Sequence, residues 1–348
     1  MIQDEAYMAR CIYLAKLGMN HVAPNPMVGA VVVYDDTIIG EGFHRCYGDA
    51  HAEPNAIRSV KNPELLSEST LYVNLEPCSH YGKTPPCANL IVSKGIKRVV
   101  IGSLDPNPKV AGKGISILKD AGVQVDLGIL GAESRSLNRR FYCYQDKKRP
   151  YIILKWAQTA NGFLDVKRVD NSTNALKISN AVTTQLTHKM RAENMAIMVG
   201  TNTALLDNPS LTVRHWHGKN PIRVIIDKKN KIPEDFTVKD GKVRTLIFGE
   251  VSRRTSGSSE FIHLDESEDG LAFMINEMYK RGIHSVLVEG GATLLNSFIR
   301  ANLWDEANVE VSSVTIDDGI VAPTIDEEFV YSSQMIENHR WKHYYNKI

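Results

Sequence analysis

Hydrophobic residues recur along the first 145 or so residues in patterns that alternate between helix and strand. Apolar side chains spaced three to four residues apart over residues 4–18 predict a helix that ends at Gly18. Two short β-branched runs, residues 28–34 and 37–43, flank Asp35-Asp36 and predict a hairpin. The same criteria predict helices at 51–60 and 88–94, and strands at 70–75, 97–102 and 123–127. Strands that alternate with helices indicate a sheet covered on both faces.

A polar, basic stretch at residues 145–150 interrupts this pattern and predicts a domain boundary. We therefore expect one domain over residues 1–146 and a second over residues 147–348. The second half is again α/β, with a polar loop at 169–174 and no G-x-G-x-x-G dinucleotide fingerprint. Its predicted strands are 151–156, 196–199, 223–226, 245–248 and 285–288, and its predicted helices are 183–191, 271–281 and 292–299.

Composition narrows the class of protein. Of 348 residues, 43% are hydrophobic and 23% are charged, which is typical of a globular protein and excludes a disordered chain or a coiled coil. The formal net charge is +1, so the basic excess of a protein that binds nucleic acid or anionic membranes is absent. No apolar run reaches the roughly 18–20 residues that a membrane span needs. The N-terminus lacks the pattern of a secretory signal, and we expect a cytoplasmic protein.

The residues most informative about chemistry in the first half are His51, Glu53, Cys78 and Cys87. Five cysteines are a sparse, odd set, so two that lie close in sequence favour metal binding over a disulfide framework. One histidine and two thiolates give zinc three protein ligands and leave a fourth position for water, as in catalytic sites. Glu53 follows His51 by two residues and can reach that water without binding the metal. Zinc deaminases divide the work in this way, with the glutamate moving protons.

A closed, structural zinc site is the alternative interpretation, and it requires a fourth protein ligand. His80 is the candidate for that ligand. We favour the open site with one zinc ion per chain, because a closed site leaves Glu53 without a role. Cys11, Cys46 and Cys143 are interpreted as packing residues or surface thiols.

The motif Pro-Cys-x-His-x-Gly-x-Thr-Pro-Pro-Cys at residues 77–87 resembles the deaminase signature of the bifunctional riboflavin-biosynthesis deaminase/reductase family. Segments 24–32 and 105–114 also resemble that family, so the resemblance covers the whole first half. It implies a cytidine-deaminase-like α/β/α sandwich that removes the 2-amino group of a phosphoribosylated diaminopyrimidinone. The family positions around the pyrimidine or its phosphate correspond to Asn25, His44, His80, Lys83, Asp105 and Asn107. As alternatives, Asn25 and Asn107 are turn residues beside prolines, and His44 is a strand-end histidine.

A strand, two glycines and a helix form the strongest feature of the second half, at residues 286–297. Backbone N–H groups at such a turn suit a phosphate or pyrophosphate, and Glu289 places a carboxylate at the end of the strand. Arg191 and Arg214 flank a second strand and loop and suit a ligand phosphate. For Arg191, a surface salt bridge is the simpler interpretation.

These segments, with residues 154–158, resemble the reductase half of the same family, which is similar to dihydrofolate reductase in fold and uses NADPH. The resemblance implies reduction of the opened ribose to a ribityl chain, with Lys155 and Glu289 as candidates for polarising and protonating the sugar. It assigns Arg191, Leu211, Arg214 and Glu289 to the substrate. It assigns to the nicotinamide cofactor Gln158, Lys177, Thr203, Asp207, Gly291, Ala292, Thr293, Leu294, Leu295, Asn296 and Ser297.

Two positions depart from the family pattern. Asn161 stands where the family usually has an aspartate, so it keeps hydrogen bonding but cannot act as a base. Lys177 stands where a tryptophan is usual, which removes a flat stacking surface but offers a cation to a phosphate.

The leading hypothesis is a two-domain riboflavin-pathway enzyme that binds zinc and NADPH, acts on small phosphoribosylated pyrimidines, and forms a homo-oligomer. The alternative within enzymes is a zinc nucleobase deaminase with a non-catalytic, nucleotide-binding C-terminal domain. A nucleotide- or RNA-binding module with structural zinc is disfavoured, because the net charge is near zero and aromatic residues are not interleaved with basic ones. We expect no nucleic-acid partner and no membrane.

Overall fold

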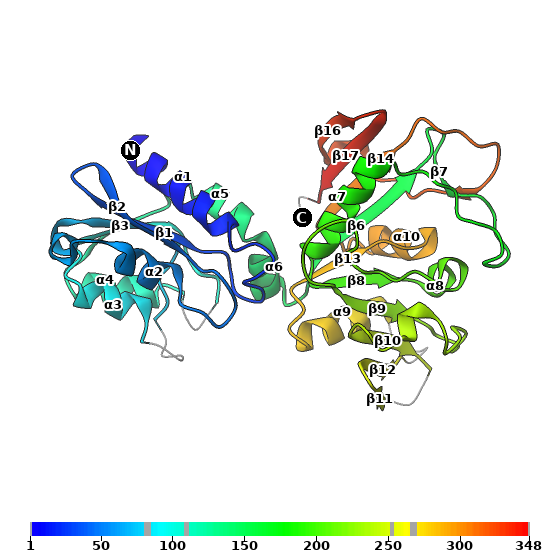
Figure 1. The fold of residues 1–348 in the computed structure, drawn as a ribbon, viewed down its shortest axis with the longest axis horizontal. Helices are drawn as coiled ribbons and strands as arrows, with labels where there is room; N and C mark the ends of the chain where they lie inside the picture. The colour runs from blue at the N-terminus through cyan, green and yellow to red at the C-terminus, as the bar shows by residue number, and fades with distance from the viewer. Residues whose placement is uncertain (1, 80–84, 108–110, 251–253, 265–269, 347–348) are drawn as a thin grey trace. The chain divides into compact units, whose positions relative to one another are not determined.

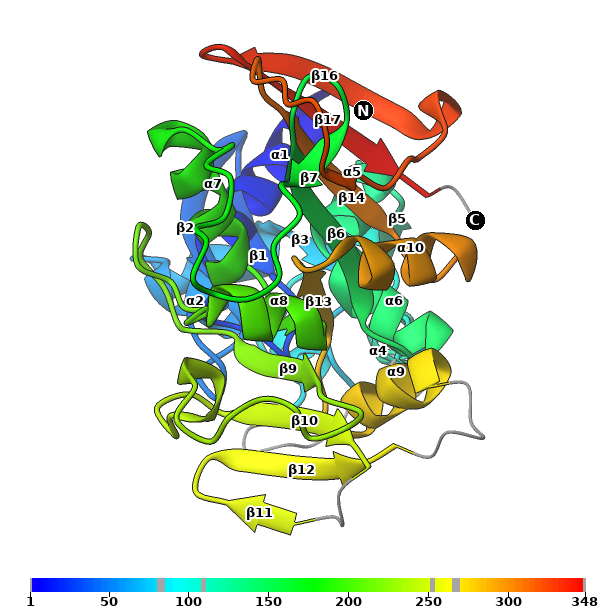
Figure 2. The same ribbon diagram turned by 90° about the vertical axis from the view of Figure 1, so that its right-hand side faces the viewer.

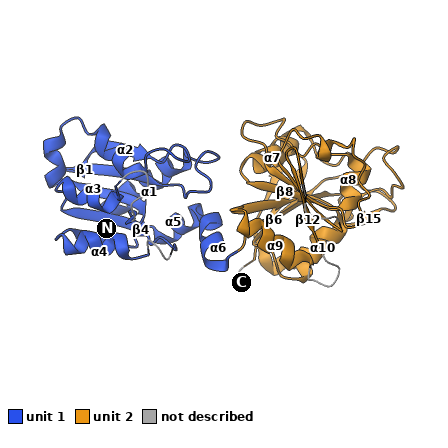
Figure 3. Cartoon of the chain, turned by 90° about the horizontal axis from the view of Figure 1, so that it is seen from below, with its two compact units in different colours: residues 1–148 blue, residues 149–348 orange. Residues whose placement is uncertain are grey.

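The computed structural model describes residues 2–79, 85–107, 111–250, 254–264 and 270–346. The chain divides into two compact units, Met1–Lys148 and Arg149–Ile348, which Figure 3 colours separately. Within the described ranges, no helix is both long and apolar enough to cross a membrane. The five cysteines are free thiols.

Unit 1 is built around a five-stranded sheet of order β2-β1-β3-β4-β5 (Figure 1). β1 pairs antiparallel with β2 and β3, whereas β3, β4 and β5 run parallel. The strands are β1 (Gly29–Tyr34), β2 (Thr37–Phe43), β3 (Thr70–Leu75), β4 (Arg98–Ser103) and β5 (Gln124–Leu127). The helices are α1 (Ile2–Lys16), α2 (Ala52–Ser59), η1 (Pro63–Glu68), α3 (Cys87–Ser93), α4 (Lys113–Asp120), α5 (Gly131–Leu137) and α6 (Arg139–Lys147).

Side chains that alternate along these strands build a hydrophobic core on each face of the sheet. Ala30 and Val32 of β1 join the core formed with α2, α3 and α4. Val31 and Val33 of the same strand join the core formed with α1 and α5. Unit 1 is therefore an α/β/α sandwich, as the sequence predicts.

Unit 2 contains a ten-stranded sheet of order β11-β12-β10-β9-β8-β13-β6-β14-β17-β16 (Figure 2). The strands from β12 to β14 are parallel, and β11, β17 and β16 are antiparallel to their neighbours. The strands are β6 (Tyr151–Gln158), β7 (Phe163–Asp165), β8 (Ala196–Val199), β9 (Ile222–Ile226), β10 (Thr245–Gly249), β11 (Arg254–Ser256), β12 (Ser259–His263), β13 (Ser285–Val288), β14 (Glu306–Val311), β15 (Ile320–Val321), β16 (Val330–Ile336) and β17 (His339–Tyr345). The helices are α7 (Ala181–Ala192), α8 (Thr201–Asp207), η2 (Thr237–Lys239), α9 (Gly270–Lys280), α10 (Ala292–Arg300) and η3 (Glu327–Phe329).

The two faces of this sheet differ in chemistry. Ile152, Leu154 and Trp156 of β6 face a large apolar core that includes side chains of α9 and α10. Ile197 and Val199 of β8 face a smaller core on the opposite side, with α8. Because side chains alternate along a strand, β6 directs Lys155 away from the larger core. A charged side chain is therefore buried on the second face of the sheet.

The structure contains several elements that were not predicted from the sequence. The unpredicted elements are the helices α4, α5, α6 and α8, the short helices η1, η2 and η3, and the strands β7, β11, β12, β14, β15, β16 and β17. The predicted helices and strands are present, most with ends shifted by one or two residues. The division between the two units follows Lys148 and lies within the polar stretch 145–150, where α6 ends at Lys147.

Candidate active sites

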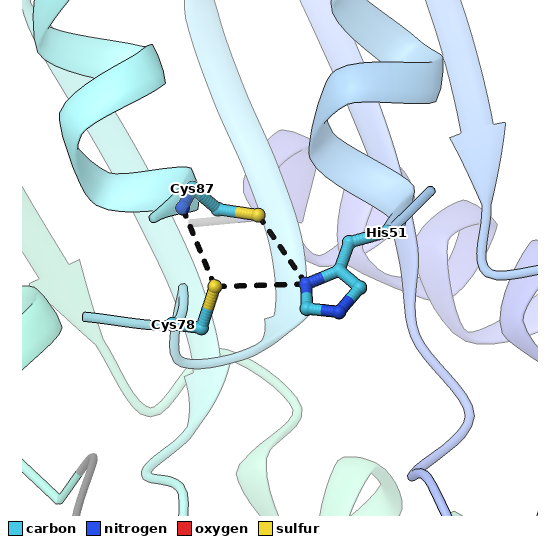
Figure 4. A group of neighbouring side chains, drawn as sticks. All are labelled: His51, Cys78 and Cys87. Atoms are coloured by element: carbon cyan, nitrogen blue, oxygen red, sulfur yellow. Dashed lines mark hydrogen bonds between the residues drawn. The ribbon is translucent and has the colours of Figure 1, made fainter. Parts of the chain in front are cut away.

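Three side chains of unit 1 that could hold a metal ion converge at the ends of three secondary-structure elements (Figure 4). His51 precedes α2, Cys78 follows β3, and Cys87 is the first residue of α3. The Nδ1 atom of His51 lies 3.6 Å from Sγ of Cys78 and 3.4 Å from Sγ of Cys87. All three ligand atoms lie within 4.8 Å of one another.

These distances fit a tetrahedral zinc ion. Zinc at about 2.3 Å from sulfur and about 2.05 Å from nitrogen separates the two ligand atoms by roughly 3.6 Å. The two observed nitrogen–sulfur distances, 3.4 and 3.6 Å, are close to that value. Hydrogen bonding with Cys87 lowers the pKa of the Cys78 thiol, which favours a thiolate there. His80, the candidate fourth ligand, lies outside the described residues.

Glu53 lies in the first turn of α2, two residues after His51. Its side chain is buried, and this burial raises the pKa of its carboxyl to about 7. Neither oxygen belongs to the convergent group of ligand atoms. The arrangement provides a carboxyl group that can take up and release protons next to a three-ligand site.

Two of the proposed substrate positions of unit 1 are joined to each other. Nδ2 of Asn25 lies 3.1 Å from Nε2 of His44, and Nδ1 of His44 lies 3.1 Å from the backbone oxygen of Ala50. The His44 ring also packs edge-on against His51, with ring centroids 5.5 Å apart. Burial lowers the pKa of His44, which favours the neutral imidazole. His44 thus directly follows β2 and lies in contact with His51, one of the three candidate ligands.

Two further substrate positions of unit 1, Asp105 and Asn107, belong to a loop that follows β4. Oδ1 of Asp105 accepts a hydrogen bond from the backbone N–H of Asn107 at 2.8 Å. The buried carboxylate of Glu76 accepts backbone N–H groups from this loop and from the start of α4. The sequence analysis did not identify Glu76. An acidic residue that directly follows an apolar strand and precedes Pro77-Cys78 could have indicated it. Lys83, like His80, lies outside the described residues.

Unit 2 contains a cavity of about 880 Å³ near the carboxyl ends of β6, β8 and β13. Ligands of parallel α/β sheets bind at such ends, in pockets of roughly 300–1,000 Å³. Lys155 and Glu289 both line the cavity. The proposed cofactor positions that line it are Lys177, Thr203, Asp207, Gly291, Ala292, Thr293, Leu294, Leu295 and Ser297. Gln158 and Asn296 do not line it, and Gln158 instead accepts a hydrogen bond from Nε1 of Trp156 at 2.8 Å.

The Gly290-Gly291 turn leaves little room for side chains. A Cβ at Gly290 would lie 2.8 Å from Cγ1 of Val199, and one at Gly291 would lie 3.2 Å from Oγ1 of Thr203. Gly291 has φ of 71°, a conformation that side chains disfavour. Bare backbone at the wall of the cavity fits the close approach of a dinucleotide. The positive φ also means that a larger residue at 291 is strained whether or not a ligand is bound.

Arg191 and Glu289 form a buried pair. Nε and Nη2 of Arg191 bond to the two carboxylate oxygens at 2.8 and 2.6 Å, and the side chains are 12% and 10% exposed. Arg191 therefore does form a salt bridge, but this pair is largely buried and does not lie on the surface. Leu211 is buried, and the backbone N–H of Arg214 donates to Nδ1 of His188 at 2.9 Å. Neither Leu211 nor Arg214 lines the 880 Å³ cavity.

The departures from the family pattern have distinct environments. Nδ2 of Asn161 donates to the backbone oxygen of Ile316 at 2.7 Å, so this side chain ties two loops together. Lys177 is exposed at the wall of the cavity. Arg168, which the sequence did not single out, lines the cavity and donates to Oδ1 of Asp207 at 2.5 Å. The carboxylate of Asp207 is thereby fixed at the cavity.

Comparisons with known proteins agree with this division of the chain. Residues 1–103 match the model of the cytidine and deoxycytidylate deaminase zinc-binding region, and residues 150–329 match that of the RibD C-terminal domain. The riboflavin biosynthesis protein RibD of Bacillus amyloliquefaciens is 39% identical over 331 residues, which span 92% of this chain and 87% of that protein. RibD of Aquifex aeolicus is 34% identical over 351 residues, which span 96% and 95% of the two chains.

A solved structure gives the same result over the full length. The diaminohydroxyphosphoribosylaminopyrimidine deaminase/5-amino-6-(5-phosphoribosylamino)uracil reductase of Thermotoga maritima superposes with a TM-score of 0.87 at 35% identity, covering 99% of both chains. A zinc-binding deaminase domain followed by a dihydrofolate-reductase-like reductase domain defines a bifunctional class of enzyme. The chain belongs to the RibD family, the deaminase/reductases of riboflavin biosynthesis. Zinc in the first domain and NADPH in the second are the cofactors of this family. The alternative with a non-catalytic second domain is disfavoured, since the reductase match extends to residue 329.

Proposed function

We propose that the two units act in succession on one phosphoribosylated pyrimidine. Unit 1 deaminates 2,5-diamino-6-(5-phosphoribosylamino)pyrimidin-4(3H)-one, and unit 2 then reduces the ribosyl side chain to ribityl with NADPH. The observation that carries this proposal is the presence, in one chain, of both sets of chemical groups. His51, Cys78 and Cys87 converge beside a buried glutamate in unit 1, and Lys155 and Glu289 line one cavity in unit 2.

In the deaminase site, His51, Cys78 and Cys87 hold zinc, which when bound makes water acidic enough to attack at neutral pH. The Glu53 carboxylate takes a proton from the attacking water and delivers protons to the pyrimidine ring and to the leaving amine. Water adds to the ring carbon, the carbon–nitrogen bond breaks, and ammonia leaves. Asn25, His44, Asp105 and Asn107 bind the pyrimidine or its phosphate, and His80 and Lys83 are proposed to join them.

In the reductase site, NADPH when bound supplies the hydride to the first carbon of the sugar. Lys155 supplies a proton to the sugar oxygen released when the ring carbon–oxygen bond breaks. Glu289 holds Arg191 toward the substrate, and Leu211 and Arg214 complete that side of the site. Gln158, Lys177, Thr203, Asp207 and residues 291–297 are the positions that would hold the cofactor, and all of them except Gln158 and Asn296 line the cavity.

The proposal extends to assembly and compartment. Small molecules are the partners, and the net charge of +1 gives no support for nucleic-acid binding. Five free thiols suit a reducing compartment such as the cytoplasm. We further propose that the chain works as a homo-oligomer.

The test is to supply the diaminopyrimidinone substrate with and without NADPH and to identify the products by mass. Without NADPH the reaction should stop at the deaminated phosphoribosyl compound, and with NADPH it should continue to the ribityl compound. Glu53→Gln should lower deamination by about 10²–10⁴-fold, the usual contribution of a general acid–base group. The same variant should still reduce substrate that has already been deaminated.

The exposed Glu133 provides the matched control. Glu133→Gln should leave both activities unchanged. Deamination by Glu53→Gln at the wild-type rate would remove Glu53 from the mechanism. Reduction of the diamino compound before deamination would reverse the proposed order.

A further inference from the structure

The second face of the sheet in unit 2 carries a buried row of polar side chains across β6, β14 and β17. In β14, Ala307 and Val309 face the large apolar core, so Asn308 and Glu310 face the opposite side. Strand pairing places Asn308 opposite Lys155, and Glu310 opposite Trp341. Buried polar residues in the centre of a sheet carry a cost in stability unless they are paired. The row therefore calls for a functional explanation.

Glu310 is the centre of this row. Its side chain is 0% exposed, and Oε2 accepts a hydrogen bond from Oγ of Ser179 at 2.6 Å. Oε1 lies 2.6 Å from Nδ1 of His339, on β17. These two contacts fix the carboxylate at both oxygens.

The cation that pairs with Glu310 across the sheet is Lys155. Nζ of Lys155 lies 3.8 Å from Oε2 of Glu310, and within the described part of the chain this is its one carboxylate contact within 4.0 Å. That distance permits charge attraction but is too long for a hydrogen bond. Nζ also lies 6.0 Å from the centroid of the Trp341 ring, at the outer range of a cation–π contact. The donors of the ammonium group thus remain available to a ligand in the cavity.

Other charges near Lys155 come from α7 and from the end of β13. Arg191 and Glu289 neutralise each other as a bidentate pair. Glu310 is then the carboxylate that balances the charge of Lys155. Burial lowers the pKa of Lys155, and the negative charge of Glu310 opposes that effect.

We propose that Glu310 is a positioning residue for the reduction, which fixes the Lys155 ammonium at the cavity wall and keeps it protonated until the substrate takes the proton. His339 and Ser179 orient Glu310, so the β16–β17 hairpin takes part in building the reductase site. Glu310 itself does not line the cavity and acts through Lys155. The match to the RibD C-terminal domain ends at residue 329, so His339 lies beyond it. This inference rests on the proposed role of Lys155 as the proton donor.

Glu310→Gln tests the proposal, because it keeps the shape of the side chain and removes its charge. We expect kcat and kcat/KM for reduction to fall together by roughly 10–100-fold, as for an interaction that assists the transition state. The affinity for NADPH and the deaminase activity should stay within about twofold. The alkaline limb of the reductase pH profile should move to lower pH, since Lys155 loses the charge that favours its protonated form. His339→Gln should produce the same changes to a smaller extent.

Glu306→Gln is the matched control. Glu306 is a buried carboxylate on the same face of β14, with an oxygen 3.0 Å from Nε2 of His343. It does not line the cavity, so its loss should affect stability but not kcat or the pH profile. Equal losses of reductase activity in the Glu306 and Glu310 variants, with no change of pH profile in either, would overturn the proposal.

Lys155→Met separates this inference from the proposed function. If Lys155→Met reduces substrate at the wild-type rate, then the role of Lys155 as the proton donor is wrong. If Lys155→Met is inactive while Glu310→Gln is fully active with an unchanged pH profile, then only the positioning role of Glu310 is wrong.

Discussion

Arg191 binds both carboxylate oxygens of Glu289, with Nε 2.8 Å from Oε1 and Nη2 2.6 Å from Oε2. Burial opposes ionisation of Glu289, but the charge of Arg191 outweighs it and holds the pKa of the carboxyl below its usual value. Glu289 therefore stays ionised at neutral pH and is a poor proton donor. Lys155 is the better candidate of the two cavity-lining groups, because a buried ammonium releases its proton more readily.

The bidentate geometry predicts the outcome of Arg191→Lys. A lysine keeps the charge but cannot bond to both oxygens at once, so Glu289 loses its fixed orientation. We expect kcat/KM for reduction to fall by on the order of 10²-fold, as for small misplacements of catalytic groups. Deamination should be unaffected. Steady-state kinetics of the two reactions provide the measurement.

Lys189→Gln is the control, since Lys189 is a partly exposed cation on the same helix. It should leave reduction unchanged. An Arg191→Lys variant that reduces substrate as fast as the wild type would show that the paired geometry is not needed.

The metal-binding group could be predicted from sequence because its chemistry is carried by residue type and spacing. His51 and Glu53 are two residues apart, and Cys78 and Cys87 lie within one motif. Local structure places each of them at the end of a strand or the start of a helix. The convergence of these side chains then follows from the α/β architecture, which periodicity also predicts.

The surroundings of Lys155 could not be predicted in the same way. Glu310 lies on a strand that alternates polar with apolar residues, a pattern that normally indicates one face exposed to water. In the protein both faces of β14 are buried, because the β16–β17 hairpin and the segment just before α7 supply partners to the polar side chains. Those partners are distant in the sequence, so only the three-dimensional pairing of β14 with β17 shows them.

The zinc content of the protein should be one ion per chain, and it should depend on Cys78. Cys78→Ser removes one of two thiolates, so we expect loss of zinc and of deamination. Reduction of deaminated substrate should continue. Elemental analysis together with both activity assays provides the measurement.

Cys46→Ser is the matched control, because Cys46 is a half-buried thiol outside the ligand group. It should keep zinc and both activities. Two zinc ions per chain, or full zinc occupancy in Cys78→Ser, would contradict the open three-ligand site.

Asp4 links the first helix to the sheet and should make unit 1 sensitive to acid. Arg98 donates to both carboxylate oxygens at 3.1 Å, and these hydrogen bonds lower the pKa of Asp4. The stabilisation is present above the unfolded pKa, about 4, and is lost as the pH falls through the lower folded value. Asp4→Asn should therefore cost on the order of 1 kcal/mol at pH 7 and much less near pH 2.

Denaturant unfolding at the two pH values measures this difference, with Glu5→Gln as the control. Glu5 is exposed on the same helix and should contribute little at either pH. A stability gap for Asp4→Asn that is equal at pH 7 and pH 2 would show that the ion pair does not cause it.

Glu76 should control binding of the pyrimidine rather than binding of the metal. Its Oε2 accepts N–H groups of Asp105 and Gly112 at 3.3 and 3.0 Å, and Oε1 accepts those of Gly114 and Ile115 at 3.0 and 3.3 Å. In Glu76→Gln an amide NH₂ group would face these donors, and a buried donor without an acceptor costs about 1–3 kcal/mol. The loop that carries Asp105 and Asn107 should then shift.

We expect Glu76→Gln to raise the KM for deamination by roughly tenfold or more, because that loop carries the proposed pyrimidine contacts. The zinc content should not change, since the carboxylate of Glu76 is not among the convergent ligand atoms, and the reductase activity should not change, since its groups belong to unit 2. The exposed Glu133→Gln serves again as the control for a neutral substitution. A normal KM would show that the loop keeps its position without the carboxylate. Loss of zinc would instead show that Glu76 supports the neighbouring Cys78, because the two residues are separated only by Pro77.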